Sequence, residues 1–140
     1  MLFVSVTRLR LRSWRYLPGF ILQSLRAAWQ AKSTRGNLST CIMGEADLAF
    51  WTRTIWGDEP SMRSFMLSGA HRQAMPRLLD WCDEAAVVHW SREAPAPPSW
   101  SECHQRLLGE GRASKVSHPS QAQRRFEFPA PRALVQLRLR

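Results

Sequence analysis

One sequence feature most constrains this fold: the spacing of apolar residues changes in a definite order along the first 90 or so residues. Alternating apolar residues predict a strand, whereas apolar residues three or four positions apart predict a helix. Pro18 suits the first turn of a helix, and Gly36-Asn37 ends it. The predicted elements are a strand at 2–12, a helix after Pro18, strands at 38–44 and 48–56, helices from 57 and at 70–79, and a strand at 81–90.

This β-α-β-β-α-β order is that of the ferredoxin-like fold, in which a four-stranded antiparallel sheet carries its helices on one face. We therefore predict the α+β class. In the first helix, apolar residues repeat at amphipathic spacing, and Met62, Phe65 and Met66 form the stripe of the second. The helices cover only one face of such a sheet, so the other face must meet water, a partner or a ligand. The repeat in the first helix consists of Leu17, Ile21, Leu25, Ala28 and Trp29.

The chain after residue 93 has a different character. Residues 94–98 form a proline-rich linker, and Ser99 with Glu102 makes a capping box for a short helix. Residues 112–133 are predicted to be irregular, and residues 133–140 alternate again, as an added edge strand would. We therefore divide the chain into a ferredoxin-like domain at 1–93 and an extension at 94–140 that covers either the cavity or the sheet edge.

The formal charge of +9 first suggests a nucleic-acid partner. Residues 1–93 hold 12 basic and 8 acidic residues, however, whereas residues 94–140 hold 8 and 3. More than half of the excess charge thus belongs to the extension, which does not indicate one basic binding face. RNA-binding sheets of this order carry a Lys/Arg-Gly-Phe-type motif on a central strand, and residues 48–56 lack it. We therefore expect no nucleic-acid partner.

Cysteine usage and the N-terminus bear on the compartment. Cys41, Cys82 and Cys103 are too widely spaced for a zinc motif and too few for a disulfide framework, so reduced thiols are expected. The apolar run at 17–25 is broken and far shorter than the roughly 20 residues that span a bilayer. The early arginines lack the helical period of a transit peptide. We expect a cytoplasmic protein with no membrane span and no metal site.

Several short motifs resemble a known superfamily. Residues 50–54 with Trp56, the acidic turn Asp58-Glu59, and the segment from Ser68 to His71 are similar to the dimeric α+β barrel superfamily, in particular its antibiotic-biosynthesis-type monooxygenases. The strings at 68–90 and 111–119 resemble an uncharacterised bacterial branch that is similar to spheroidene-monooxygenase-like proteins.

The resemblance implies a homodimer in which two sheets close face to face, so that the uncovered sheet faces line a cavity. It also implies chemistry that ranges from cofactor-free oxygenation of aromatic or polyketide substrates to haem-linked reactions. The cofactor is therefore left open, with none required or haem as the alternatives.

Two histidines are the candidate catalytic residues. His71 lies three positions after Ser68 at the start of a predicted helix, where it could act as a base or orient a ligand; Ser68 is a candidate binding residue beside it. The alternative is a helix cap with a packed imidazole. His89 lies mid-strand, where it could line the cavity or ligate haem, or else be a hydrogen-bonded core residue.

Arg53 and Trp51 are the candidate substrate-binding residues. They share one face of the strong strand, and together they would suit a planar acidic ligand. The alternative for Arg53 is a side chain that reaches over the sheet edge to solvent. We expect a monooxygenase-like oxidoreductase that acts on a hydrophobic or aromatic small molecule in the barrel cavity. A non-catalytic small-molecule-binding or scaffold dimer of the same fold is the alternative.

Overall fold

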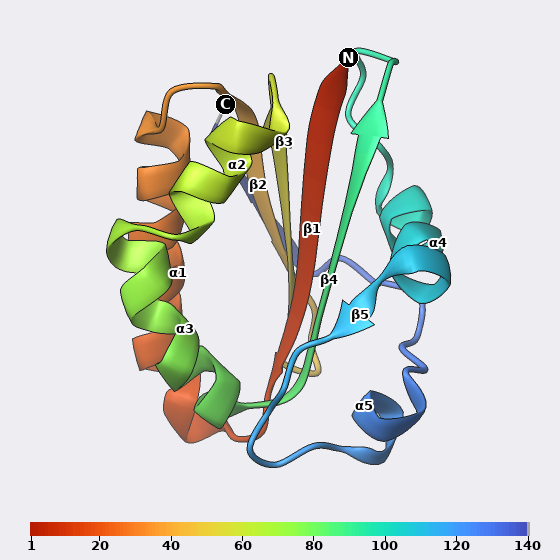
Figure 1. Ribbon diagram of the computed structural model, residues 1–140. Helices are drawn as coiled ribbons and strands as arrows, with labels where there is room; N and C mark the ends of the chain where they lie inside the picture. The colour runs from red at the N-terminus through yellow and green to blue at the C-terminus, as the bar shows by residue number, and fades with distance from the viewer. Residues whose placement is uncertain (140) are drawn as a thin grey trace.

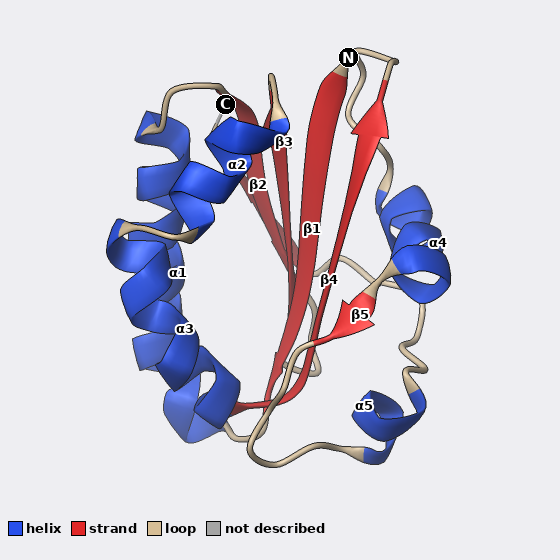
Figure 2. Ribbon diagram, viewed as in Figure 1, coloured by secondary structure: helices blue, strands red, loops and turns tan. Residues whose placement is uncertain are grey.

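The computed structural model describes residues 1–139, and its centre is one antiparallel sheet (Figures 1 and 2). The sheet has six strands in the order β5-β4-β1-β3-β2-β6, so the prediction of four strands was wrong. The extra two come from the extension and lie at the two edges. The strands are β1 (Leu2–Leu11), β2 (Asn37–Gly44), β3 (Ala49–Trp56), β4 (Cys82–Arg92), β5 (Arg112–Ala113) and β6 (Val135–Arg138).

Three helices cover one face of the sheet (Figure 1). They are α1 (Leu17–Ser33), which follows a short 3-10 helix at Trp14–Tyr16, α2 (Glu59–Met66) and α3 (Gly69–Trp81). Pro76 lies inside α3, which nevertheless runs on to residue 81. We call this side of the sheet the helix face.

The side of α1 that faces the sheet is not the side that the apolar repeat predicts. Its buried residues are Phe20, Ala28 and Ala31, whereas Ile21, Leu25 and Trp29 are 44%, 45% and 63% exposed. Most of the apolar repeat therefore faces outward, because small alanines allow the other side of the helix to approach the sheet closely. An exposed apolar stripe remains along α1.

The opposite face of the sheet is covered by the extension. Helices α4 (Trp100–Glu110) and α5 (Gln121–Arg125) lie on this side in Figure 1. Cys103 and Leu107 of α4, together with Phe128, pack into one cluster with strand residues such as Val6 and Trp51. The face that was expected to line an open cavity is therefore a packed core, and we call it the covered face.

Half of the capping box predicted for α4 is confirmed, because the Ser99 hydroxyl accepts the Glu102 backbone N–H at 3.1 Å. The Glu102 carboxylate instead accepts from Arg92 at 2.6 Å. The edge strand at the C-terminus is also confirmed, since β6 pairs with β2. Residues 112–133 are less irregular than expected, because β5 and α5 lie within them. Ser120 caps α5, and Phe126 ends it with φ 54°.

All three cysteines are free and buried. None of the helices within residues 1–139 is both long and apolar enough to span a membrane. Over the same range, no group of three or more His, Cys, Asp or Glu residues is arranged to hold a metal ion.

Candidate functional site

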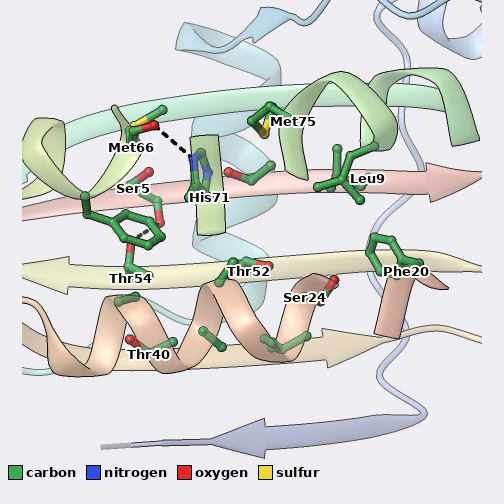
Figure 3. Close-up of a pocket in the computed structure, with 17 residues that line it drawn as sticks. Ser5, Leu9, Phe20, Ser24, Thr40, Thr52, Thr54, Met66, His71 and Met75 are labelled. Carbon is green, nitrogen blue, oxygen red and sulfur yellow. Dashed lines mark hydrogen bonds between the residues drawn. The ribbon is translucent and has the colours of Figure 1, made fainter. Parts of the chain in front are cut away.

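A cavity of about 80 Å³ lies between the helix face of the sheet and helices α1 and α3 (Figure 3). Its floor comes from β1, β2 and β3, and its roof comes from the helices. Because it lies between the two layers, a molecule bound there would be shielded from water by the sheet on one side and by the helices on the other. This cavity is therefore on the side of the sheet opposite to the one that the sequence analysis favoured.

Hydroxyl groups line the floor of the cavity. Ser5 lies opposite Thr54 on the neighbouring strand, and Thr7 lies opposite Thr52; Thr40 of β2 adds a fifth hydroxyl beside Thr54. Within residues 1–139, the hydroxyls of Ser5, Thr7 and Thr52 have no hydrogen-bond partner in the protein. Since polar groups in a buried site gain from being paired, these hydroxyls are available to a ligand oxygen.

His71 of α3 lines the cavity among these hydroxyls and apolar side chains. Its Nδ1 lies 3.1 Å from the backbone oxygen of Met66. A carbonyl oxygen can only accept, so Nδ1 carries the proton in this contact and Nε2 is the free, basic nitrogen of the neutral ring. The ring also packs on Phe65, with 4.8 Å between the ring centroids. His71 is thus held in the tautomer that a general base needs.

We expect His71 to be neutral at pH 7. Burial lowers its pKa from the usual 6.5, and the hydrogen bond to Met66 only partly opposes this. Between the lowered folded value and 6.5, the unfolded chain binds a proton that the folded chain does not, so stability rises with pH in that window and is lost as the pH falls through it. Nitrogen NMR of the imidazole across pH measures this, and a His71 ring that is charged at pH 7 would contradict it.

Gln30 of α1 fixes the turn that carries His71. Its side-chain oxygen accepts the His71 backbone N–H at 2.8 Å, and its nitrogen donates to the backbone oxygens of Ser68 and Phe65 at 2.8 and 3.2 Å. Gly69 has φ +59°, and a Cβ there would lie 3.1 Å from the Gln30 side chain. The tight turn at Gly69 and the hydrogen bonds of the Gln30 side chain together set where the His71 ring enters the cavity.

Ser68 does not reach this cavity. It is exposed, and its hydroxyl donates to the backbone oxygen of Ser64 at 2.7 Å. It occupies the N-cap position of α3, but its side chain makes no capping hydrogen bond. The structure thus separates Ser68 from the site role predicted for it, even though it adjoins the His71 turn.

Trp51 and Arg53 lie on the covered face of the sheet. Because side chains alternate along β3, Trp51 and Arg53 point to one face of the strand, and Thr52 and Thr54 point to the other face, toward the cavity. Trp51 donates from Nε1 to Glu45 at 2.9 Å, while Arg53 donates to the backbone oxygen of Pro98 at 2.8 Å. The Arg53 guanidinium also lies 4.7 Å from the centre of the Trp100 ring. The Trp51 ring lies 6.4 Å from the Trp100 ring and 6.2 Å from the His104 ring, centroid to centroid, so both side chains contact the protein's own extension.

His89 lies on the helix face of β4, but it lines a separate surface groove beyond α2. That groove includes Met62, Arg63 and Arg112. Burial, followed by the charges of Arg112 and Arg63, lowers the pKa of His89. Its Nε2 is buried without a hydrogen-bond partner in the described part of the chain, and its ring packs 6.0 Å from that of Phe3. Because Nε2 is enclosed by protein, this nitrogen is not placed to bind a haem iron in the structure.

Of the five candidate site residues, the structure thus places only His71 in the cavity. Sequence reasoning missed the hydroxyl floor and Gln30. The signal for the floor was present, because strand positions beneath helices ordinarily carry aliphatic residues, and here β1 and β3 carry Ser or Thr at alternating positions. Gln30 had no such signal, since its partners are backbone groups far along the chain.

Solved structures share this fold. An archaeal conserved protein from Methanosarcina mazei has a TM-score of 0.60 and 14% identity, over 66% of this chain and 94% of its own. A Nitrosomonas europaea protein provisionally named as an antibiotic biosynthesis monooxygenase has a TM-score of 0.61 and 13% identity, over 69% and 94%. SnoaB from Streptomyces nogalater, described as a cofactor-independent oxygenase, has a TM-score of 0.56 and 13% identity, over 69% and 98%.

These similarities show that the chain has the fold of the antibiotic-biosynthesis-monooxygenase-like proteins, as the resemblance implied. The finer resemblance to the spheroidene-monooxygenase-like branch stays a prediction. No curated protein matches the sequence. The family model described as a domain of unknown function, DUF3291, matches residues 13–131, which run from the start of α1 past the end of α5 and leave out β1 and β6. The chain therefore belongs to the DUF3291 family.

Proposed function

We propose that this chain is a monooxygenase-like enzyme that acts on a small hydrophobic or aromatic molecule in the cavity beneath α1 and α3. The observation that supports this most directly is the half-buried His71 ring, whose Nδ1 is held by the Met66 carbonyl, beside unpaired hydroxyls in a mostly apolar cavity. A base next to donors that stabilise an anion is what proton abstraction from a phenol or an activated C–H group requires.

The proposed reaction needs molecular oxygen and no group beyond this chain. Nε2 of His71 takes a proton from the substrate, and the hydroxyls of Ser5, Thr7 and Thr52 donate to the resulting oxyanion. The anion gives an electron pair to O₂, and a C–O bond forms to yield a peroxide. His71 gives its proton to the peroxide and then removes the remaining hydrogen of the attacked carbon. As that C–H bond and the O–O bond break, C=O forms and the departing hydroxide takes the proton from His71 to leave as water. One O₂ thus gives one carbonyl oxygen and one water.

The apolar part of the cavity supports the same proposal. Phe65, Met66 and Met75 surround His71 and keep water from the anion. A charge that develops in such a site interacts more strongly with the fixed hydroxyls than it would in water. The sulfur atoms and aromatic rings also suit an aromatic ligand.

The test measures oxygen uptake and product mass with ¹⁸O₂ over a panel of small phenols and enolisable ring ketones. We expect wild-type protein to incorporate one ¹⁸O, and His71→Asn to lower kcat by about 10²–10⁴-fold. The wild-type rate should fall as the pH drops through the lowered pKa of His71. His118→Asn is the matched control because His118 is exposed in the extension. An unchanged kcat in His71→Asn would contradict the proposed role.

Binding without any oxygen uptake would favour the non-catalytic alternative, a small-molecule-binding or scaffold protein of the same fold. The homodimer also stays a prediction. Because α4 covers the sheet face through which the resemblance implies dimer formation, a dimer would need another surface or a displaced α4. His89, Arg53, Trp51 and Ser68 are not assigned a role in the proposed reaction.

A further inference from the structure

A second cavity lies beside the one that contains His71, and its walls are almost entirely apolar. Its volume is about 90 Å³, and it lies where α1 approaches the β2–β6 edge of the sheet. Among residues 1–139, Ser24 is the only polar side chain in its wall. The other residues are Phe20, Ile21, Leu25, Ile42, Gly44, Phe50, Val135 and Leu137.

The two cavities share part of their walls. Phe20 and Ser24 of α1 and Ile42 of β2 line both of them. These shared side chains can change rotamer, which would join the two cavities. Figure 3 shows Phe20 and Ser24 on the side of the first cavity away from Met66. A molecule whose polar end lies by His71 would thus extend past Phe20 into the second cavity.

The second cavity explains why β6 carries exposed apolar side chains, which are otherwise unfavourable. Val135 and Leu137 pair with Gly44 and Ile42, and they lie 60% and 40% exposed beside Ile21 and Leu25 of α1. Gly44 leaves room here, because a Cβ on it would lie 3.1 Å from both Phe50 and Val135. Apolar side chains that gather around a hollow are typical of a binding site for an apolar group.

We propose that the ligand is amphipathic, with an oxygen-bearing head at His71 and the hydroxyl floor and an apolar tail in the second cavity against β6. This rests on the proposed function for the position of the head. It adds that β6, a strand of the extension, selects the substrate by its tail. The substrate class is then a phenol or enolisable ketone with an alkyl or prenyl-like chain, rather than a bare ring.

The test is calorimetric titration with phenol and with 4-alkylphenols of increasing chain length up to 4-hexylphenol. Each CH₂ that enters the second cavity should lower Kd by about four-fold. In the double variant Val135→Asp/Leu137→Asp, Kd for 4-hexylphenol should rise by at least about ten-fold, while Kd for phenol stays within about two-fold. Leu134→Asp is the control, since it adds a charge to a neighbouring exposed position that lies outside the second cavity.

Hydrogen exchange at the amide of Leu139, which donates to the Thr40 oxygen at 2.9 Å, reports whether β6 still pairs in the double variant. Two results overturn this inference. One is a Kd that does not fall with chain length in the wild-type protein. The other is a double variant in which β6 still pairs and in which Kd rises equally for phenol and for 4-hexylphenol. If phenol binds and His71→Asn weakens it while the series is flat, the proposed function survives alone. If no phenol binds at all, both proposals fail.

Discussion

Glu84→Ala is expected to lower the free energy of unfolding by about 3–5 kcal/mol, because it leaves a buried arginine without its counter-charge. Arg8 is 1% exposed and donates to Glu84 at 2.6 Å. Arg10 donates to the same carboxylate at 3.2 Å, and the Ser120 hydroxyl donates to it at 2.8 Å. Urea denaturation measures the loss.

The pH dependence of this contribution has a definite sign. Burial alone would raise the pKa of Glu84, but hydrogen bonds from Arg8 and Ser120, together with the charges of Arg8 and Arg10, hold the pKa below its ordinary value. The stabilisation is therefore fully present above the ordinary glutamate pKa and is lost as the pH falls through the lowered folded value. In Glu84→Ala, the part of the acid sensitivity that comes from this residue should disappear.

A matched double variant separates the charge effect from packing. Arg8→Met/Glu84→Met removes both charges together, so it should be more stable than Glu84→Ala. Arg8 also lies 4.7 Å from the centre of the Phe128 ring, so Glu84→Ala should increase hydrogen exchange around residues 120–128 as well. A loss below about 1 kcal/mol in Glu84→Ala would show that Arg8 finds water or another partner, contrary to this prediction.

Removal of residues 94–140 is expected to make the remaining chain self-associate. Without α4 and Phe128, the covered face would expose apolar residues of three strands, among them Val6, Ile55 and Val88. Contiguous apolar patches of this kind favour association or aggregation. Light scattering after size-exclusion chromatography should show an assembly of more copies than the full-length chain forms.

The control for this deletion ends the chain at residue 128. It keeps α4, α5 and Phe128 and removes only the following segment with β6. This shorter deletion should retain the assembly state of the full-length protein. Equal copy numbers for the chain that ends at residue 93 and for the full-length protein would contradict the prediction.

The sequence was sufficient for the element order, because alternation and turn residues are local. It was not sufficient to predict which side of α1 faces the sheet. There, Ile21, Leu25 and Trp29 have the stronger hydrophobicity, yet Ala28 and Ala31 allow the closer approach to the sheet. Close packing depends on side-chain volume as well as on polarity. Which volume fits at an interface can be judged only when the structure of the facing element is known.

The candidate site was predicted in part for a related reason. His71, which the sequence singled out by its spacing after Ser68, lines the cavity, whereas Trp51 and Arg53 lie on the opposite face of the sheet. Alternation tells which residues share a face of β3, and it does not tell which face holds a cavity. That depended on where α4 would pack, and α4 is about 50 residues further along the chain.

The position of α4 also bears on how the protein behaves when it is diluted. A sheet face that is covered by a second subunit becomes uncovered below the dissociation constant of the dimer. A cover that is tethered by a short linker instead acts at an effective concentration of the order of millimolar, which does not change with the protein concentration. The sheet beneath the cavity, and with it the position of the Ser and Thr hydroxyls, should therefore be as well ordered in a scarce protein as in an abundant one.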